Sequence, residues 1–516
     1  MNDPTFANTF ADQENQLKPA QPCVMVIFGA TGDLTARKLM PALYNLAIQG
    51  LLPKDFACVA FARRDKKQEE FRQELYEDIK KYSRTQPVDD KKWKPFSEKI
   101  FYHQGNFDNH DDYERLKKFL ATLDKQCNTK GNRVFYLATQ PSFFPVIVEQ
   151  LHKHKLVYNE KVEHERWSRV VIEKPFGHDL NSALSLQKHV KQFLEENQIY
   201  RIDHYLGKET VQNLLVFRFA NSIFEPLWNN RYIDNIQITM GESIGIGTRG
   251  RFWEEAGILR DIVQNHLMQL MSLVSMEPPV SMGANAIRDE KVKVLQAIRP
   301  IDINNVDDYA VLGQYGPGYI NGEEVKGYRE EDNVDPHSVQ GTFVALELFI
   351  DNWRWSGVPF YLRAGKRMAK RVTEIAITFN QVPGVLFKGK VDKKGQTLLV
   401  IRIQPDEGIS LRINCKVPGL SALSIQPVKM DFRYGTSFGE TPPDAYERLI
   451  CDSMVGDGTL FARGDEVLTS WKLYTPLLEA WQNRPRTGFP NYSAGRWGPE
   501  NANRITEKTG RSWRLV

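Results

Sequence analysis

Between residues 23 and 200, two patterns of apolar and polar positions alternate along the chain. Short unbroken apolar runs are typical of strands buried on both faces of a sheet. Such runs cover residues 23–28 and 56–61, and we also predict strands over residues 132–138 and 167–172. Stretches with helical apolar spacing, such as 38–47, separate them. Strands that alternate with helices predict a doubly wound α/β sheet in this half of the chain.

The pattern changes from about residue 235 onward, where strands with hairpin-length gaps and few helices follow one another. The predicted strands cover residues 236–240, 342–350, 374–379, 397–404, 409–414 and 428–432. Such a series predicts a largely antiparallel sheet, which leaves one face available as a dimer surface. We expect residues 359–371 to form a basic loop able to clamp an anion, or a solvated turn. We expect the chain after Gln482 to be irregular and to lie on the surface.

The two patterns together predict an α/β domain joined to an α+β domain, because 516 residues exceed what one core supports. We expect a flexible N-terminal tail over residues 1–20, a Rossmann-like domain over 21–204 and a larger domain with a mainly antiparallel sheet over 205–516.

Composition narrows the class of protein. The net charge of +4 is small for this length and argues against a nucleic-acid binder. Five dispersed cysteines without a C-x-x-C pair, and ten histidines without ligand spacing, predict no disulfide framework and no metal site. No apolar run is long enough to span a bilayer, and the polar N-terminus lacks the features of a targeting peptide. We therefore expect a cytoplasmic protein with no membrane partner.

A glycine-rich turn follows the first predicted strand and precedes the first helix. It reads Gly29-Ala30-Thr31-Gly32-Asp33-Leu34. Gly29 permits the tight turn, Gly32 permits close approach of a ligand, and the helix N-terminal amides suit a pyrophosphate. The spacing is G-x-x-G and not the common G-x-G-x-x-G, so a plain turn is the alternative.

The second strand ends in Ala62-Arg63-Arg64-Asp65. NAD enzymes usually place an acid here for the ribose hydroxyls, whereas NADP enzymes place a cation near the 2′-phosphate. Arg63 and Arg64 favour NADP. Asp65, one position later, is an acid and is the one residue here that argues against NADP.

A charged pair and a proline, Glu173-Lys174-Pro175, follow the buried run 167–172. Ligands of open α/β sheets bind at such strand ends, so Lys174 is a candidate to contact both cofactor and substrate. The Lys174–Pro175 bond is a candidate for the cis form. An ordinary strand-terminating turn is the alternative.

The densest group of polar side chains is Arg201-Ile-Asp-His-Tyr-Leu-Gly-Lys208. His204, Tyr205 and Lys208 can all donate hydrogen bonds to one small anion, and Gly207 permits close approach. A helix start with solvated charges is the alternative.

Residues 257–271 have the apolar spacing of a helix that carries Asp261 and His266. Five positions separate the two, which is too far round an α-helix for them to share a face. Leu267 and Met268 follow His266, so a hydrogen-bonded core histidine is the alternative to a catalytic one.

Six motifs in series resemble those of the glucose-6-phosphate dehydrogenase family, and the resemblance covers roughly residues 23–480. The motifs are Gly29-Ala-Thr-Gly-Asp-Leu, Glu173-Lys-Pro-Phe-Gly, Arg201-Ile-Asp-His-Tyr-Leu-Gly-Lys, Arg260-Asp-Ile-Val-Gln-Asn-His, Val358-Pro-Phe-Tyr-Leu-Arg-Ala-Gly-Lys and Asp444-Ala-Tyr-Glu-Arg. Such a member oxidises glucose 6-phosphate with NADP to 6-phosphoglucono-1,5-lactone, the first step of the oxidative pentose phosphate pathway.

The resemblance also implies residue roles. His266 would be the general base for the C1 hydroxyl, with Asp203 orienting it. Residues near the substrate would be Lys38, Lys174, His204, Tyr205, Lys208, Glu242, Asp261, Lys366 and Arg371. NADP would meet Gly29, Ala30, Thr31, Gly32, Asp33, Leu34, Arg63 and Lys174. Residues 21–204 would then be the NADP-binding domain, and residues 205–516 the substrate-binding and dimerisation domain. No metal is implied, because the cofactor carries the redox chemistry and the protein positions and deprotonates.

Two departures from the family pattern are present. Thr31 replaces the usual serine and keeps the hydroxyl. The chain after Gln482 does not resemble the segment with which eukaryotic members bind a second, structural NADP, so we expect no such site. We expect a homodimer or homotetramer.

Two other classes of protein remain as alternatives. Another sugar oxidoreductase would share the glycine-rich turn and Glu-Lys-Pro, but is not expected to combine the motif ending at Lys208 with the one ending at His266. A non-catalytic sugar-phosphate sensor would use Lys208 but has no need of His266 as a base.

Overall fold

The computed structural model describes residues 20–158, 166–383, 385–387, 395–419, 423–439, 442–483 and 488–516. The chain divides into two compact units. The first contains Met1–Lys174, Lys188–Ile202 and Asp444–Phe461, and the second Pro175–Gln187, Asp203–Pro443 and Ala462–Val516. The domain boundary expected after residue 204 stays a prediction; residues 175–187 and 444–461 join the unit on its other side. Residues 1–19 of the expected tail lie outside the described chain.

The first unit is built on one sheet, with the strand order β18-β6-β5-β4-β1-β2-β3. Its strands are β1 (Cys23–Phe28), β2 (Phe56–Ala62), β3 (Ile100–Gln104), β4 (Arg133–Leu137), β5 (Ser168–Ile172), β6 (Ile199–Ile202) and β18 (Phe461–Ala462). The pairings among β1 to β6 are parallel. The order reverses between β1 and β4, which is where ligands bind in doubly wound sheets.

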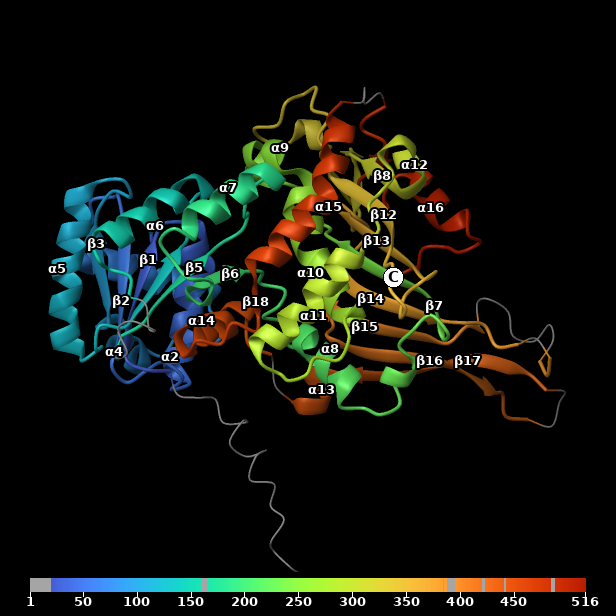
Figure 1. Cartoon of the computed structure of the whole chain (residues 1–516), viewed down its shortest axis with the longest axis horizontal. Helices are drawn as coiled ribbons and strands as arrows, with labels where there is room; N and C mark the ends of the chain where they lie inside the picture. Colours follow the sequence, from blue (N-terminus) through green and yellow to red (C-terminus); the bar gives the residue numbers. More distant parts are fainter. Residues whose placement is uncertain are drawn as a thin grey trace, which may run out of the picture. The chain divides into compact units, whose positions relative to one another are not determined.

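Helices cover both faces of this sheet (Figure 1). They are η1 (Thr35–Leu39), α2 (Met40–Ile48), α3 (Gln68–Tyr82), α4 (Asp90–Ser97), α5 (His110–Cys127), α6 (Phe144–Lys153) and α14 (Ala445–Val455). Alternate β1 residues Cys23, Met25 and Ile27 pack with α2, α3 and α14. On the other face the Phe28 ring lies 6.1 Å from that of Tyr113 in α5. Because each strand is buried on both faces, the unbroken apolar runs of the sequence are explained, and the predicted fold class is confirmed.

The second unit is built on an eight-stranded sheet, with the order β17-β16-β15-β14-β7-β13-β12-β8. Its strands are β7 (Ile233–Gly241), β8 (Ala310–Gly313), β12 (Phe343–Phe349), β13 (Pro359–Gly365), β14 (Val372–Phe379), β15 (Leu398–Gln404), β16 (Gly408–Lys416) and β17 (Ile425–Arg433). The β7–β13 pair is parallel, and the other described pairs are antiparallel. The predicted mainly antiparallel sheet is confirmed.

One element was wrongly predicted in this sheet. Residues Pro359–Gly365 form the buried strand β13 and not part of a basic loop. The strand pairs with β7 on one side and β12 on the other, and all seven of its residues are buried. The basic character belongs to the residues that follow, Lys366 to Arg371.

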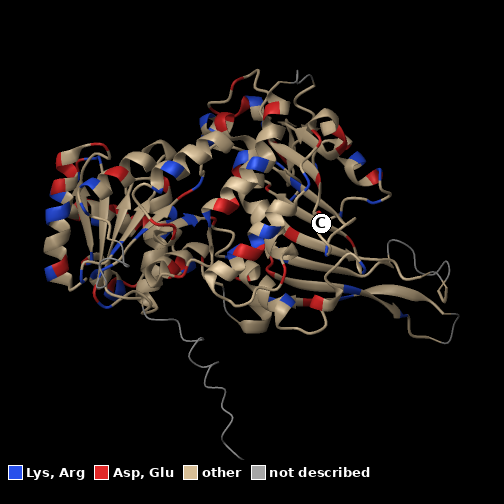
Figure 2. Ribbon diagram, in the orientation of Figure 1, with Lys and Arg blue, Asp and Glu red and all other residues tan. Residues whose placement is uncertain are grey.

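The longer helices of this unit are α8 (Glu209–Phe219), α9 (Gly250–Ile258), the π-helix η6 (Leu259–Leu267), α10 (Met268–Ser275), α11 (Ala284–Ala297) and α15 (Gly464–Gln482). Among the described residues, no helix is both long and apolar enough to cross a membrane. Lysine, arginine and acidic residues are interspersed along helices such as α5 (Figure 2).

The C-terminal segment is more ordered than the sequence predicted. Tyr492 in β19 (Tyr492–Ser493) pairs with β9 (Tyr315–Gly316), and α16 (Arg504–Glu507) follows. The Arg363 guanidinium of β13 lies 4.9 Å from the rings of both Trp497 and Trp513. Aromatic residues scattered among the prolines and glycines therefore fix this segment to the sheet, which overall composition did not indicate.

Candidate active site

The glycine-rich turn has the geometry that the sequence required. Gly29 has φ +88°, and a Cβ there would stand 2.3 Å from the carbonyl oxygen of Ala138. The amides of Gly29 and Ala30 both donate to the carbonyl of Phe61, at 3.0 and 3.3 Å. The Gly32 amide donates to the Gly29 carbonyl at 2.9 Å, which closes the turn before η1. Only glycine fits position 29, so the ends of β1, β2 and β4 can meet closely.

Arg63 directly follows β2, and Arg63, Arg64 and Asp65 are all exposed. The Arg63 guanidinium lies 5.9 Å from the centre of the Phe107 ring. The carbonyl oxygen of Arg64 accepts a hydrogen bond from the Tyr102 hydroxyl. An exposed guanidinium over an aromatic ring can also form planar, paired bonds to a phosphate.

At the end of β5, the buried Glu173 carboxylate accepts a hydrogen bond from the Tyr136 hydroxyl at 2.6 Å. Lys174 follows and is half-buried. The cis peptide bonds of the described chain precede Pro87, Pro405 and Pro490, so the expectation of a cis Lys174–Pro175 bond is wrong. A proline after a strand is compatible with either isomer, and sequence does not select between them.

The second unit contains a buried aspartate–histidine pair. Asp203 Oδ1 lies 2.6 Å from His266 Nδ1, and both residues are 3% exposed. The same carboxylate oxygen accepts the Tyr205 amide at 3.0 Å, which fixes its position. Because a carboxylate can only accept, the bond places the proton of neutral His266 on Nδ1 and leaves a lone pair on Nε2. This arrangement is that of a general base held by an orienting acid.

His266 lies on a π-helix, where hydrogen bonds join residues five positions apart. Asp261 and His266 are therefore neighbours along this helix, and the expectation that they face different sides is wrong. The side chain of Asn265 supports this winding. Its Oδ1 accepts the His266 amide at 2.6 Å, and its Nδ2 donates to the Arg260 carbonyl at 3.0 Å. The spacing of apolar residues could not show that Asp261 and His266 are neighbours, because that spacing was interpreted with the winding of an α-helix.

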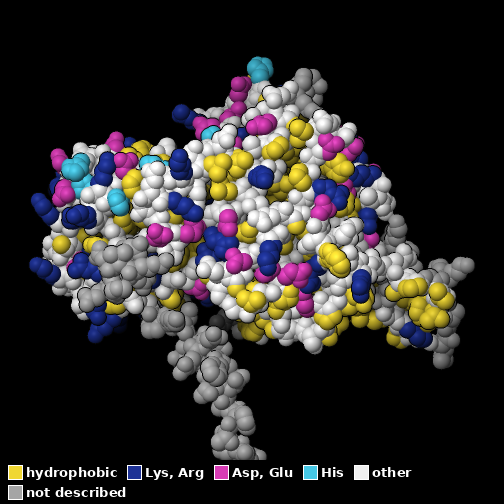
Figure 3. Space-filling view, in the orientation of Figure 1, with side chains coloured by type: hydrophobic (Ala, Val, Ile, Leu, Met, Phe, Trp, Pro, Cys, Tyr) yellow, Lys and Arg dark blue, Asp and Glu magenta, His cyan; other side chains and the backbone are white. Residues whose placement is uncertain are grey.

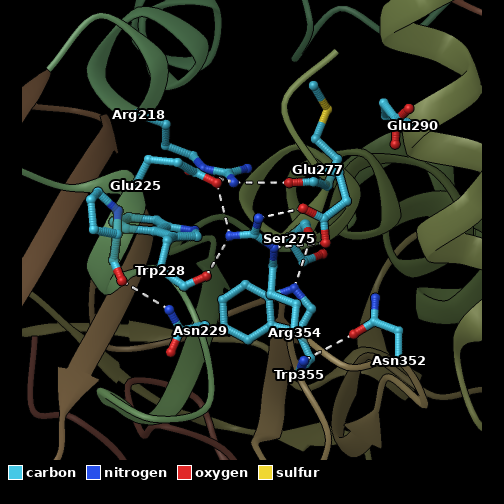
Figure 4. Close-up of polar contacts among 12 residues, drawn as sticks. Arg218, Glu225, Trp228, Asn229, Ser275, Glu277, Glu290, Asn352, Arg354 and Trp355 are labelled. Atoms are coloured by element: carbon cyan, nitrogen blue, oxygen red, sulfur yellow. Dashed lines mark hydrogen bonds and ion pairs between the residues drawn. The ribbon is translucent and has the colours of Figure 1, made fainter. Parts of the chain in front are cut away.

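Side chains from other elements anchor the far end of this helix, where η6 continues as α10 (Figure 4). The Arg218 guanidinium donates to the carbonyls of Leu273 and Met276, at 3.0 and 2.8 Å. The indoles of Trp228 and Trp355 donate to the carbonyls of Val274 and Ser275, at 2.6 and 2.7 Å. The C-terminal carbonyls of a helix lack partners within it, so these bonds stabilise the helix that carries His266.

His204, Tyr205 and Lys208 lie together around the histidine. The rings of His204 and Tyr205 are 4.7 and 4.5 Å from that of His266. Lys208 Nζ lies 5.3 Å from the Tyr205 ring centre and precedes α8. Burial raises the pKa of Tyr205, so the phenol stays protonated and can donate.

Two residues near this group were missed from the sequence. Gln404 Nε2 donates to the Tyr205 hydroxyl at 3.1 Å and to Thr373 Oγ1 at 3.0 Å. Thr373 and Tyr205 are also in contact through their hydroxyls, at 3.3 Å. Both residues lie on strands, β15 and β14, where no motif distinguishes them from structural polar positions. Their pairing across the sheet became visible only from the fold.

Glu242 and Lys366 follow the parallel neighbours β7 and β13, whose last residues are in register. Their side chains form an ion pair, in which Lys366 is 2% exposed. Lys366 Nζ also lies 5.0 Å from the Trp253 ring centre. Arg371 is exposed, and its charge opposes the effect of burial on the pKa of Tyr205.

The predicted residues therefore gather in two groups, each within its own unit. The first unit holds the glycine-rich turn, Arg63 and Lys174. The second holds the substrate and catalytic candidates other than Lys38 and Lys174, which belong to the first unit. Asp203, His204 and His266 also bring three potential metal-ligand atoms within 4.8 Å of one another. The Asp203–His266 hydrogen bond accounts for the proximity of two of these three residues.

Two family models match the chain. "Glucose-6-phosphate dehydrogenase, NAD binding domain" matches residues 26–213, and "Glucose-6-phosphate dehydrogenase, C-terminal domain" matches residues 215–514.

Similar proteins agree with the family models. The chain is 54% identical to glucose-6-phosphate 1-dehydrogenase of Chlamydia pneumoniae over 97% of each chain. It is 46% identical to glucose-6-phosphate 1-dehydrogenase 2 of Mycobacterium bovis over 99% of this chain and 98% of that one. A solved glucose-6-phosphate dehydrogenase in complex with glucose 6-phosphate has a TM-score of 0.87 and 37% identity, covering 96% of this chain and 99% of the other. This chain belongs to the glucose-6-phosphate dehydrogenase family.

Proposed function

We propose that this protein oxidises glucose 6-phosphate at C1, with His266 as the general base and NADP as the hydride acceptor. The observation that carries the proposal is the buried pair of Asp203 and His266, whose geometry leaves His266 Nε2 able to accept a proton. Family membership supplies the substrate and the reaction.

The reaction needs one proton acceptor and one hydride acceptor. His266 Nε2 takes the proton of the C1 hydroxyl while the C1–H bond breaks and a C=O bond forms at C1. NADP, when bound, accepts the hydride from C1 at its nicotinamide ring. The products are 6-phosphoglucono-1,5-lactone, NADPH and a protonated His266, which Asp203 stabilises by its negative charge.

Residues around the base would hold the substrate. His204, Tyr205 and Lys208 would bind the phosphate, because each can donate to an anion and they lie together near His266. Lys366 and Arg371 would add positive charge. Glu242, Asp261 and Lys174 would bind the sugar hydroxyls or lie close to them.

The cofactor assignment rests on the first unit. The backbone at Gly29 has no room for a Cβ, so a pyrophosphate can closely approach residues Gly29 to Leu34. The exposed guanidinium of Arg63 suits a 2′-phosphate better than a 2′-hydroxyl, which favours NADP over NAD. Lys174 would also meet the cofactor.

We also propose an oligomeric state and a cellular location for the protein. The outermost strand β17 leaves Val428 and Met430 exposed, at 46% and 58%, which favours a homodimer or homotetramer formed through this sheet. Cys23 and Cys58 are buried free thiols whose pKa burial raises to about 12, as suits a protein of the reducing cytoplasm. Sedimentation of the full chain tests the assembly.

The direct test of the activity is NADPH absorbance after addition of NADP and glucose 6-phosphate to the purified chain. We expect turnover with glucose 6-phosphate and much less with free glucose. A chain that binds glucose 6-phosphate without reducing NADP or NAD would be a sugar-phosphate sensor, and turnover of other sugars alone would indicate a different sugar oxidoreductase.

A further inference from the structure

A second cluster of metal-ligand residues lies in the first unit and includes none of the residues assigned above. His110 is the first residue of α5, Glu114 lies one turn later, and His154 directly follows α6. Residues four apart on a helix share a face, so the side chains of His110 and Glu114 are neighbours. One potential ligand atom from each of the three residues lies within 4.8 Å of the other two. In the space-filling view, histidine side chains gather over α5 and α6 (Figure 3).

The contacts within this cluster are short. His154 Nδ1 lies 2.8 Å from Glu114 Oε1, and the rings of His110 and His154 have their centres 4.2 Å apart. Two ligands about 2.0–2.1 Å from a tetrahedral zinc ion are roughly 3.3 Å apart. The His154 Nδ1–Glu114 Oε1 distance of 2.8 Å is shorter than that value, and all three ligand atoms lie within 4.8 Å of one another, so small rotations of the exposed side chains bring all three ligands to one ion.

The cluster combines a fixed ligand with two accessible ones. The His154 side chain is 1% exposed and stacks on the Tyr113 ring, with centres 5.7 Å apart and planes at 23°. Its Nε2 is buried and has no hydrogen-bond partner within the described residues. The Glu114 side chain is 44% exposed and His110 is exposed, which provides an entry path for an ion.

We propose that His110, Glu114 and His154 form a binding site for a divalent transition-metal ion of the zinc class. Two imidazoles and one carboxylate are the ligand set that such ions favour over magnesium or calcium, which prefer oxygen. The ion replaces the proton shared by His154 and Glu114 and joins the start of α5 to the end of α6. A fourth position stays open to water. Binding therefore stabilises the first unit and is separate from the reaction at His266.

The test is calorimetric titration of the full chain with Zn²⁺, after removal of metal by a chelator. His110→Ala and Glu114→Gln are the variants, because both side chains are accessible and neither change leaves a cavity. Loss of one ligand should weaken zinc binding roughly a hundredfold or more, since even indirect partners of a metal site contribute tenfold to a hundredfold. Zinc should also raise the thermal midpoint of the wild-type chain and not that of either variant.

Two control variants test whether zinc binds at this cluster and not at other histidines. His152→Ala removes an exposed histidine of the same helix α6, and His266→Asn removes the other group of three potential ligands. Both should keep the wild-type zinc affinity. The proposal is overturned if wild type binds zinc only more weakly than about 1 mM, if His110→Ala and Glu114→Gln bind as wild type does, or if His266→Asn alone removes the site.

Discussion

At the scale of single residues, His266 carries the central assignment of the site. The sequence allowed either a core histidine or a base, and the structure has a histidine 3% exposed, hydrogen-bonded to Asp203. A buried histidine with a carboxylate on Nδ1 fits both roles, so the role of His266 as a base stays a prediction. Gln404 and Thr373 could not be predicted, because their role depends on contacts across the sheet.

Lys208→Ala should weaken binding of glucose 6-phosphate by roughly tenfold or more in KM, because a charge-assisted bond of about 1.5–3 kcal/mol is lost. The weak turnover of free glucose should change much less, since glucose has no phosphate. Steady-state kinetics on both sugars measures the difference. Equal losses on the two substrates would contradict the phosphate assignment.

Arg63→Ala should raise KM for NADP by about tenfold, because an exposed bond to a charged phosphate contributes on the order of 1–3 kcal/mol. KM for NAD should stay nearly constant. Arg64→Ala is the matched control, since both arginines are exposed and adjacent. If Arg64 alone changes KM for NADP, the contact lies one residue later; if neither does, Asp65 and an NAD-type site come into question.

At the scale of elements, the strands predicted from apolar runs and alternation agree with the structure within a few residues. By contrast, β13 was predicted as a loop, and β3, β6 and β8 were not predicted. The π-helix was not predicted either, because no residue pattern distinguishes π from α winding in a short helix. Gly257 precedes it with φ +60° and ψ 179°, inside α9. The helix that carries His266 therefore begins at a backbone position that favours glycine.

Gly257→Ala should lower stability by about 1–3 kcal/mol, the cost of a non-glycine residue in such a conformation. The added Cβ would also stand 2.4 Å from Gln340 Oε1. The midpoint of urea denaturation and kcat should both fall. Gly435→Ala is the control, because its Cβ would meet no atom within 4 Å and its φ is not positive. Equal midpoints for the two variants would show that position 257 carries no constraint.

At the scale of the whole molecule, the sequence predicted the fold class of each unit. It did not predict that residues 444–461, far along the chain, belong to the first unit. Residue Glu447 of α14 explains one case. Its buried carboxylate accepts from Arg84 at 2.7 Å and from Asn45 at 3.0 Å, which joins α14 to the first unit. Partners separated by hundreds of residues leave no local signal. The C-terminal segment was missed for the same reason.

Trp513→Ala tests whether the C-terminal segment stabilises the second unit. The side chain is 8% exposed, contacts Arg363 and donates to the Ala502 carbonyl at 3.0 Å. Its loss should cost roughly 3–5 kcal/mol, as for other buried tryptophans, and lower the urea midpoint. Trp353→Ala is the matched control, because that indole is 99% exposed. A superficial segment would give the same midpoint for both variants.

The central claim is that His266, held by Asp203, is the general base. The most direct measurement is kcat and KM for glucose 6-phosphate in His266→Asn, followed by NADPH absorbance, with substrate binding measured separately by calorimetry. The account predicts a fall in kcat of about a hundredfold to ten-thousandfold, the range for a positioned general base, with substrate affinity nearly unchanged. A variant with near-wild-type kcat would contradict the account and make His266 a packing residue.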